Sequence, residues 1–110
     1  MKKYIVEVYE DRTEWKNDQG QLHRLDSPAI EGFNGYKAWY VNGQLHRLDG
    51  PAVEYSNGYK AWYVNEQRHR IDGPAIEHSD GRRKYFLEGK EMTRDEYIMV
   101  QFLKGIVIHD

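Results

Sequence analysis

The sequence predicts a mainly β fold, in which β-hairpin repeats form an antiparallel meander in one elongated sheet between an N-terminal capping hairpin and a C-terminal capping helix. The first observation is a repeat: residues 20–42 recur at 43–65 with four differences in 23 positions, and again at 66–88 with ten positions of the second copy retained. A fixed period without spacers is typical of units that each pack on their neighbours. The other two observations are turn dipeptides inside each unit and a change of pattern after Gly89.

Each repeat contains a hairpin around a dipeptide that tolerates positive φ. These dipeptides are Asn34-Gly35, Asn57-Gly58 and Asp80-Gly81. The strands that precede them are expected at 29–33, 52–56 and 75–79. The strands that follow are expected at 36–41, 59–64 and 82–87, where aromatic and β-branched residues favour extended structure. A second turn is expected at Asn42-Gly43, and an extended piece then leads into Asp-Gly-Pro, where proline ends the ladder.

The N-terminal residues 1–19 resemble half a repeat. Trp15 lies 24 residues before Trp39, one more than the repeat period, which indicates one extra residue near Asp18. We therefore expect a capping hairpin with strands at 4–9 and 12–16.

The C-terminal residues 89–110 predict a helix that covers the last repeat. Thr93 and Glu96 have the spacing of a capping box, so Thr93 is the expected N-cap. The helix should end near Lys104-Gly105, and 106–108 should complete the cap. Its apolar residues are Tyr97, Ile98, Val100, Phe102 and Leu103.

Composition limits the classes of function. Hydrophobic residues make up 39% and aromatic residues 14% of a 110-residue chain, which suits one small domain with a thin, ring-rich core. The net charge is −2 and the pI about 6.2, so no general attraction to nucleic acid or anionic lipid is expected. The chain has no cysteine, and no segment predicts a signal peptide or a membrane span. We expect a cytoplasmic protein without cofactor or metal.

A polar set occurs three times, at equivalent positions of the three repeats. Arginine can bind carboxylates of its own or the next repeat, and aspartate can cap the Gly-Pro turn, so a structural ladder is the favoured interpretation. A metal site would need ligands that converge on one point, which residues one repeat apart do not. An acid–base site needs only one copy and has no nucleophile beside it, so it is a weaker alternative, as is a polar binding face. The set is His23, His46, His69, Arg24, Arg47, Arg70, Asp26, Asp49, Asp72, Glu31, Glu54 and Glu77.

The aromatic residues divide by alternation into two ladders on opposite faces of the sheet. Trp15, Trp39 and Trp62, with Tyr85, form the ladder expected in the core. Tyr36, Tyr40, Tyr59 and Tyr63, with Phe86, form the other, which one short helix cannot also cover. Because tyrosine and arginine are enriched in binding hot spots, the second ladder is a candidate protein-binding face.

Departures from the repeat mark further candidates for a specific contact. Phe33 belongs to the first hairpin, whose sequence differs from the hairpins of the other two repeats at this position. His78, Arg82 and Arg83 belong to the third repeat, which is the most divergent copy. The run Arg82-Arg83-Lys84 replaces Tyr-Lys-Ala, and a solvated edge explains it better than nucleic-acid binding in a slightly acidic chain.

The unit Tyr-x-Asn-Gly-x-x-x-x-Trp-Tyr-x-Asn-Gly, with its His-Arg-x-Asp-Gly-Pro-Ala-x-Glu extension, resembles the MORN-repeat variant family over residues 20–89. The resemblance implies β-hairpin repeats, no catalytic residues, and a small phage or bacterial protein that binds and neutralises another protein, as antitoxin-like members do. We therefore expect a non-enzymatic inhibitor with a protein partner, in which sheet edges could also pair two copies. An enzyme or nucleotide-binding protein that uses the His-Arg-Asp set is the first alternative. A nucleic-acid or membrane-surface scaffold is the second.

Overall fold

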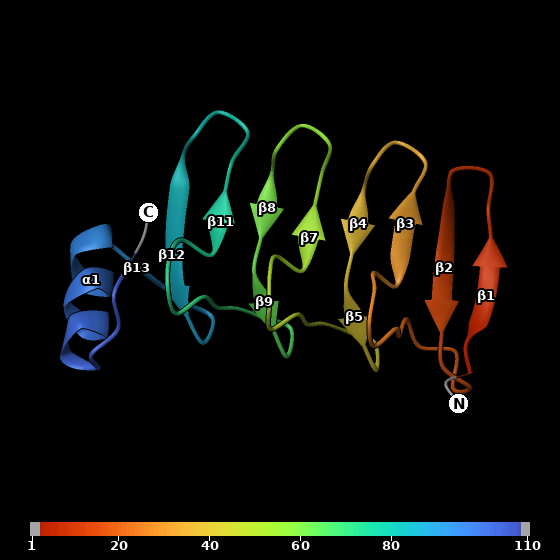
Figure 1. Cartoon of the computed structure of the whole chain (residues 1–110), viewed down its shortest axis with the longest axis horizontal. Helices are drawn as coiled ribbons and strands as arrows, with labels where there is room; N and C mark the ends of the chain where they lie inside the picture. The colour runs from red at the N-terminus through yellow and green to blue at the C-terminus, as the bar shows by residue number, and fades with distance from the viewer. Residues whose placement is uncertain (1–2, 109–110) are drawn as a thin grey trace.

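A computed structural model of the chain describes residues 3–108 and confirms the antiparallel meander. The molecule measures 44 × 30 × 20 Å, and its strands stand side by side along the longest axis, as Figure 1 shows. Nine strands form the main sheet in the order β1-β2-β3-β4-β7-β8-β11-β12-β13. Their bounds are β1 Ile5–Val8, β2 Arg12–Lys16, β3 Ile30–Gly32, β4 Lys37–Ala38, β7 Val53–Glu54, β8 Lys60–Ala61, β11 Ile76–Glu77, β12 Arg83–Leu87 and β13 Lys90–Met92.

The second strand of the first two repeats is shorter than the sequence predicts, because the chain leaves the main sheet at the tryptophan. The N–H of Trp39 still donates to the carbonyl of Ala52 (2.7 Å), whereas its own carbonyl accepts from His46 N (3.0 Å). Beyond this residue the chain forms a separate small hairpin at the lower edge of the sheet in Figure 1. These hairpins pair β5 (Tyr40–Val41) with β6 (Gln44–Leu45) and β9 (Tyr63–Val64) with β10 (Gln67–Arg68).

The turns of these small hairpins follow the backbone geometry that Asn-Gly favours. Asn42 and Gly43 have φ of 49° and 81°, the left-handed pair of a two-residue hairpin turn. In the next repeat Glu66 occupies the glycine position at φ 68°, which is strained for a residue with a Cβ. Its carboxylate accepts a hydrogen bond from Leu45 N (2.5 Å) and its N–H donates to Leu45 O (2.8 Å), so contacts with the preceding repeat offset the strain.

The N-terminal hairpin is confirmed, with β1 and β2 paired through a turn at residues 9–12. Lys16 bridges to Leu22, six positions on, whereas the equivalent Tyr40 pairs with Leu45, five positions on. The single extra residue that the sequence indicated therefore lies in the turn after β2.

The most deeply buried residues of the sheet are small. Ala29, Ala38, Ala52, Ala61 and Ala75 are at most 1% exposed. The predicted core of tryptophan rings is only partly observed, since Trp15, Trp39 and Trp62 are half-buried while Tyr85 is 5% exposed. The rings cannot be fully enclosed, because a single sheet has no second layer above them.

The C-terminal helix α1 (Arg94–Leu103) forms with the predicted capping box: Glu96 N donates to Thr93 Oγ1, and Thr93 N to Glu96 Oε1. It lies against the last strands, β12 and β13, at one end of the sheet (Figure 1). Tyr97, which is 0% exposed, packs against Tyr85 and Leu87 with Val100 and Ile108 nearby. Within residues 3–108, no helix is both long enough and apolar enough to span a membrane.

The side of the helix that meets the last repeat is more polar than expected. The hydroxyl of Tyr97 donates to Arg70 O and accepts from Gly73 N (3.2 Å). Gln101, also 0% exposed, donates to Ile71 O (2.6 Å). In contrast, Phe102 and Leu103 are more than 70% exposed. The helix thus binds the backbone of the last Arg-Ile-Asp-Gly loop as well as covering apolar surface.

We expect Tyr97→Phe to lower the free energy of unfolding by about 1–3 kcal/mol, because a buried carbonyl and a buried N–H lose their partner. Urea denaturation measures the change. Tyr55→Phe is the matched control, since Tyr55 is half-exposed and its hydroxyl has no such buried partners. Equal, small effects of both substitutions would contradict the importance of the Tyr97 hydroxyl.

Candidate functional site

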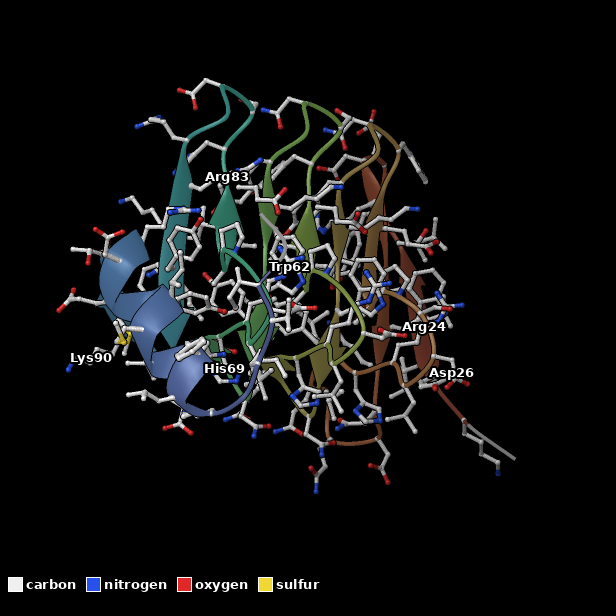
Figure 2. The ribbon with its side chains drawn as sticks, turned by 60° about the vertical axis from the view of Figure 1, so that its left-hand side comes forward. Arg24, Asp26, Trp62, His69, Arg83 and Lys90 are labelled. Atoms are coloured by element: carbon white, nitrogen blue, oxygen red, sulfur yellow. The ribbon has the colours of Figure 1, made fainter. Side chains whose placement is uncertain are left out.

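One face of the sheet carries the predicted polar ladder, and there each ladder arginine lies over an aromatic ring of the unit before it. The distances from guanidinium carbon to ring centroid are 3.8–3.9 Å, within the range of a cation–π interaction. The pairs are Arg24 over Trp15, Arg47 over Trp39 and Arg70 over Trp62, along the side that Figure 2 labels at Arg24 and Trp62.

The edges of each guanidinium are also bound. Arg47 Nε donates to Asp49 (3.1 Å), and its Nη1 donates to the carbonyl of Pro51 (3.0 Å) and lies 3.5 Å from Glu54. Arg70 repeats the arrangement with equivalent partners at 3.1, 3.1 and 3.0 Å. The arginine–carboxylate contacts predicted for the ladder are therefore present, and the ring contact is an addition that the alternation pattern did not reveal.

The glycine of Asp-Gly-Pro makes room for this guanidinium. A Cβ on Gly50 would lie 2.8 Å from Arg47 Cζ, and one on Gly73 would lie 3.0 Å from Arg70 Cζ. The first repeat has Ser27 here, and its arginine sits less tightly, with Arg24 Nη1 3.3 Å from Pro28 O and 3.6 Å from Glu31. The glycine at this position serves a close approach and not a turn.

The three histidines of the ladder each bind the backbone at the turn that ends their own repeat. Nδ1 of His23, His46 and His69 accepts from the N–H nineteen residues further along, at 2.9, 3.1 and 2.9 Å respectively. Each ring therefore uses its Nδ1 lone pair within the fold and links the beginning of a repeat to the end of the same repeat. Within residues 3–108, no cluster of histidine and carboxylate side chains has the geometry of a metal site.

We expect Gly50→Ala to lower the free energy of unfolding by about 1–3 kcal/mol through overpacking against Arg47. In an Arg47→Ala background the same change should cost much less, because the new methyl meets no guanidinium. Urea denaturation of the four proteins in this cycle gives the coupling. An equal cost in both backgrounds would mean that the glycine serves another purpose.

The opposite face of the sheet forms an open aromatic groove of about 580 Å³. Its lining includes Val53 and Ala61, at most 9% exposed, and five tyrosines. Helix α1 binds the loop that carries Arg70, on the polar-ladder side, and leaves this groove open. The residues that line it are Tyr36, Tyr40, Leu45, Val53, Tyr55, Asn57, Tyr59, Ala61, Tyr63, His78, Ser79 and Arg82.

One wall of the aromatic groove is a continuous row of rings from neighbouring strands. The centroids of Tyr36 and Tyr55 are 4.9 Å apart, those of Tyr55 and Tyr59 5.5 Å, and those of Tyr59 and His78 5.6 Å. Each ring therefore supports the next, and the row crosses the strands from one repeat to another.

The tyrosine hydroxyls of the groove are available to a ligand. Burial, with smaller contributions from neighbouring tyrosines, raises the pKa of Tyr36 to about 12, and burial is also the main cause of the raised pKa of Tyr40 and Tyr59. No hydrogen bond between these three hydroxyls and another group occurs in the described part of the chain. They remain protonated donors at neutral pH.

The structure brings together most of the predicted binding residues, but not all. Tyr36, Tyr40, Tyr59, Tyr63, His78 and Arg82 all line the aromatic groove. Phe33 lies in a neighbouring hollow with Tyr36 and Tyr55. Arg83 pairs across the strands with Glu77 and does not line the groove.

Tyr55 and Leu45 line the groove and were not among the predicted binding residues. Tyr55 could have been found from its repeat position, because 23 residues separate it from His78. The sequence pattern did not indicate Leu45, because this residue reaches the groove only through its pairing with Tyr40 in the small hairpin.

No protein-family model, no curated protein and no solved structure matches this chain. The resemblance to MORN-repeat variants therefore stays a prediction from the repeat residues.

The raised pKa of Tyr36 predicts a loss of stability in alkali. The pKa of Tyr36 is about 12 in the folded state and about 10 in the unfolded state, so the unfolded state loses its phenol proton first as pH rises. The stability that the protonated Tyr36 contributes to the folded state is therefore complete below pH 10 and is lost as pH rises towards 12. Urea denaturation across this range, compared between the wild type and Tyr36→Phe, measures it. We expect the variant to lose less stability than the wild type, and parallel curves would contradict the prediction.

Proposed function

We propose that the protein is a non-enzymatic protein-binding module and that the aromatic groove is its binding surface. The observation that carries the proposal is the open row of tyrosines, whose rings are supported by the sheet and whose hydroxyls have no partner in the described chain. Rigid aromatic side chains with a polar end are the residues that dominate protein interfaces.

The contrast between the two faces supports this choice. On the polar-ladder face, the ladder arginines and histidines are engaged within the fold. On the groove face, aromatic side chains are fixed by their neighbours but remain half-exposed. A preformed surface of this kind loses little conformational entropy on binding.

We extend the proposal to a small bacterial or phage protein that acts in the cytoplasm by neutralising its partner. This part rests on the resemblance to MORN-repeat variants. A groove of about 580 Å³ fits one protruding or extended segment of a partner.

Affinity capture from bacterial lysates, infected and uninfected, tests the binding function. We expect the wild type to retain one stoichiometric protein that survives high salt and nuclease. Tyr59→Ala should retain at least tenfold less, because it removes a central ring of the groove.

Lys60→Ala is the matched control, since Lys60 is exposed, neighbours Tyr59 in sequence and does not line the groove. Both variants must keep the wild-type unfolding midpoint for the comparison to count. Recovery of the same partner by Tyr59→Ala as by Lys60→Ala would refute the groove as the binding surface.

A further inference from the structure

The aromatic groove runs across the strands, so its features recur with the repeat. Each repeat contributes two strands to the main sheet, and neighbouring strands are about 4.8 Å apart, which gives a period of about 9.6 Å. A polyproline II helix has three residues per turn and a rise of about 3.1 Å per residue, so its period is about 9.3 Å. A segment in this conformation that lies along the groove would place every third side chain at the same position of successive repeats.

The third repeat changes one residue that lines the groove, Arg82, and two residues next to its lining, Lys84 and Arg68. Arg82 stands where the first two repeats have Tyr36 and Tyr59, and Lys84 stands where they have Ala38 and Ala61. Lys84 pairs with Ile76, which also pairs with the groove residue Ala61, so its side chain lies on the groove face.

The third change is Arg68, which occupies the repeat position of Leu45. Arg68 pairs with Tyr63 in the same way as Leu45 pairs with Tyr40. Its guanidinium carbon lies 5.8 Å from the Tyr63 centroid and 5.4 Å from that of Phe86. The groove therefore changes from aromatic to basic at this end.

The basic end is poorly neutralised. Arg82 pairs with Asp80 (2.8 Å), but no carboxylate of residues 3–108 lies within ion-pair distance of Arg68 or Lys84. Beyond the other end of the groove, the hollow that holds Phe33 is lined by Glu10, Asp11 and Arg12, and Arg12 pairs with Asp11 (2.8 Å). The excess of positive charge therefore lies at the end of the groove that carries Arg68, Arg82 and Lys84.

We propose that the aromatic groove binds an extended proline-rich segment of a partner protein, with a proline at every third position and acidic residues at the end that meets Arg68, Arg82 and Lys84. This inference rests on the proposed binding function and names the partner's chemistry. Prolines pack against the rings of successive repeats. A polyproline II segment has no internal hydrogen bonds, so its carbonyls can accept from the free tyrosine hydroxyls.

A single-stranded nucleic acid fits the groove less well. Aromatic rings beside arginines can stack bases, but such proteins carry positive charge along the whole path of the backbone. Here Arg68, Arg82 and Lys84 lie at one end, and in the hollow beyond the other end Arg12 is accompanied by the carboxylates of Glu10 and Asp11. The overall charge of −2 also opposes phosphate binding.

The test uses labelled synthetic peptides and fluorescence anisotropy with the whole protein. The probe peptides repeat Pro-Pro-Leu and carry aspartates at one end, and a second version carries them at the opposite end. Control peptides have alanine in place of every proline, and a labelled oligouridylate tests nucleic acid. We expect one orientation of the proline peptide to bind at least tenfold more tightly than its alanine control.

The variants locate the binding. Tyr59→Ala should weaken binding of the peptide at least tenfold, the double variant Arg68→Gln/Lys84→Gln should remove the preference for one orientation, and Lys60→Ala should change neither. Equal binding of proline and alanine peptides, no peptide binding in either orientation, or tighter binding of oligouridylate would overturn the inference.

These outcomes differ from failure of the proposed function. If a partner captured from lysate depends on Tyr59 but is not displaced by excess proline peptide, the groove binds protein and the proline-rich inference is wrong. If capture is independent of Tyr59, the proposed function itself fails.

Discussion

The fold depends on the contact between an arginine and the aromatic ring of the preceding unit. A single sheet of short strands buries little apolar surface, and its most buried residues are alanines. The guanidinium of Arg47 covers Trp39, with its Cζ 3.8 Å from the ring centroid, while carboxylates and a carbonyl bind its nitrogens. Arginine suits this place because a lysine has no planar group to stack. The Asp-Gly-Pro loop and the glutamate that follows it supply the groups that bind the guanidinium nitrogens.

The C-terminal helix continues the same scheme with different chemistry. After the third repeat the helix supplies the aromatic partner of the last ring, because Tyr97 packs against Tyr85 with ring centroids 4.9 Å apart. The hydroxyl of Tyr97 then binds the loop that carries Arg70. The helix therefore ends the stack by copying the ring contact of a repeat and by satisfying backbone groups that end repeats leave open.

Much of the architecture follows from the sequence because the determining interactions are local. The dipeptide Asn42-Gly43 fixes a turn, and Thr93 with Glu96 fixes the start of a helix. The arginine–ring contact joins residues of different repeats whose relative placement depends on the break at Trp39, so spacing alone did not reveal it. For the candidate site, alternation placed the tyrosines on one face, but it could not show that Arg83 points away from them or that Leu45 joins them.

The arginine contacts also give the stack a direction along the chain. The arginine of each unit lies over the ring of the unit before it, and the ring of each unit is covered by the arginine of the unit after it. A further copy of the 23-residue unit, inserted between the first and second repeats, would find an aromatic ring on one side and an arginine on the other. Both caps would remain unchanged, and the aromatic face would grow by one unit. The architecture is therefore modular in length, because duplication of a single segment of the gene would extend the surface by one repeat. The near identity of residues 20–42 and 43–65 is the sequence pattern that such a duplication leaves.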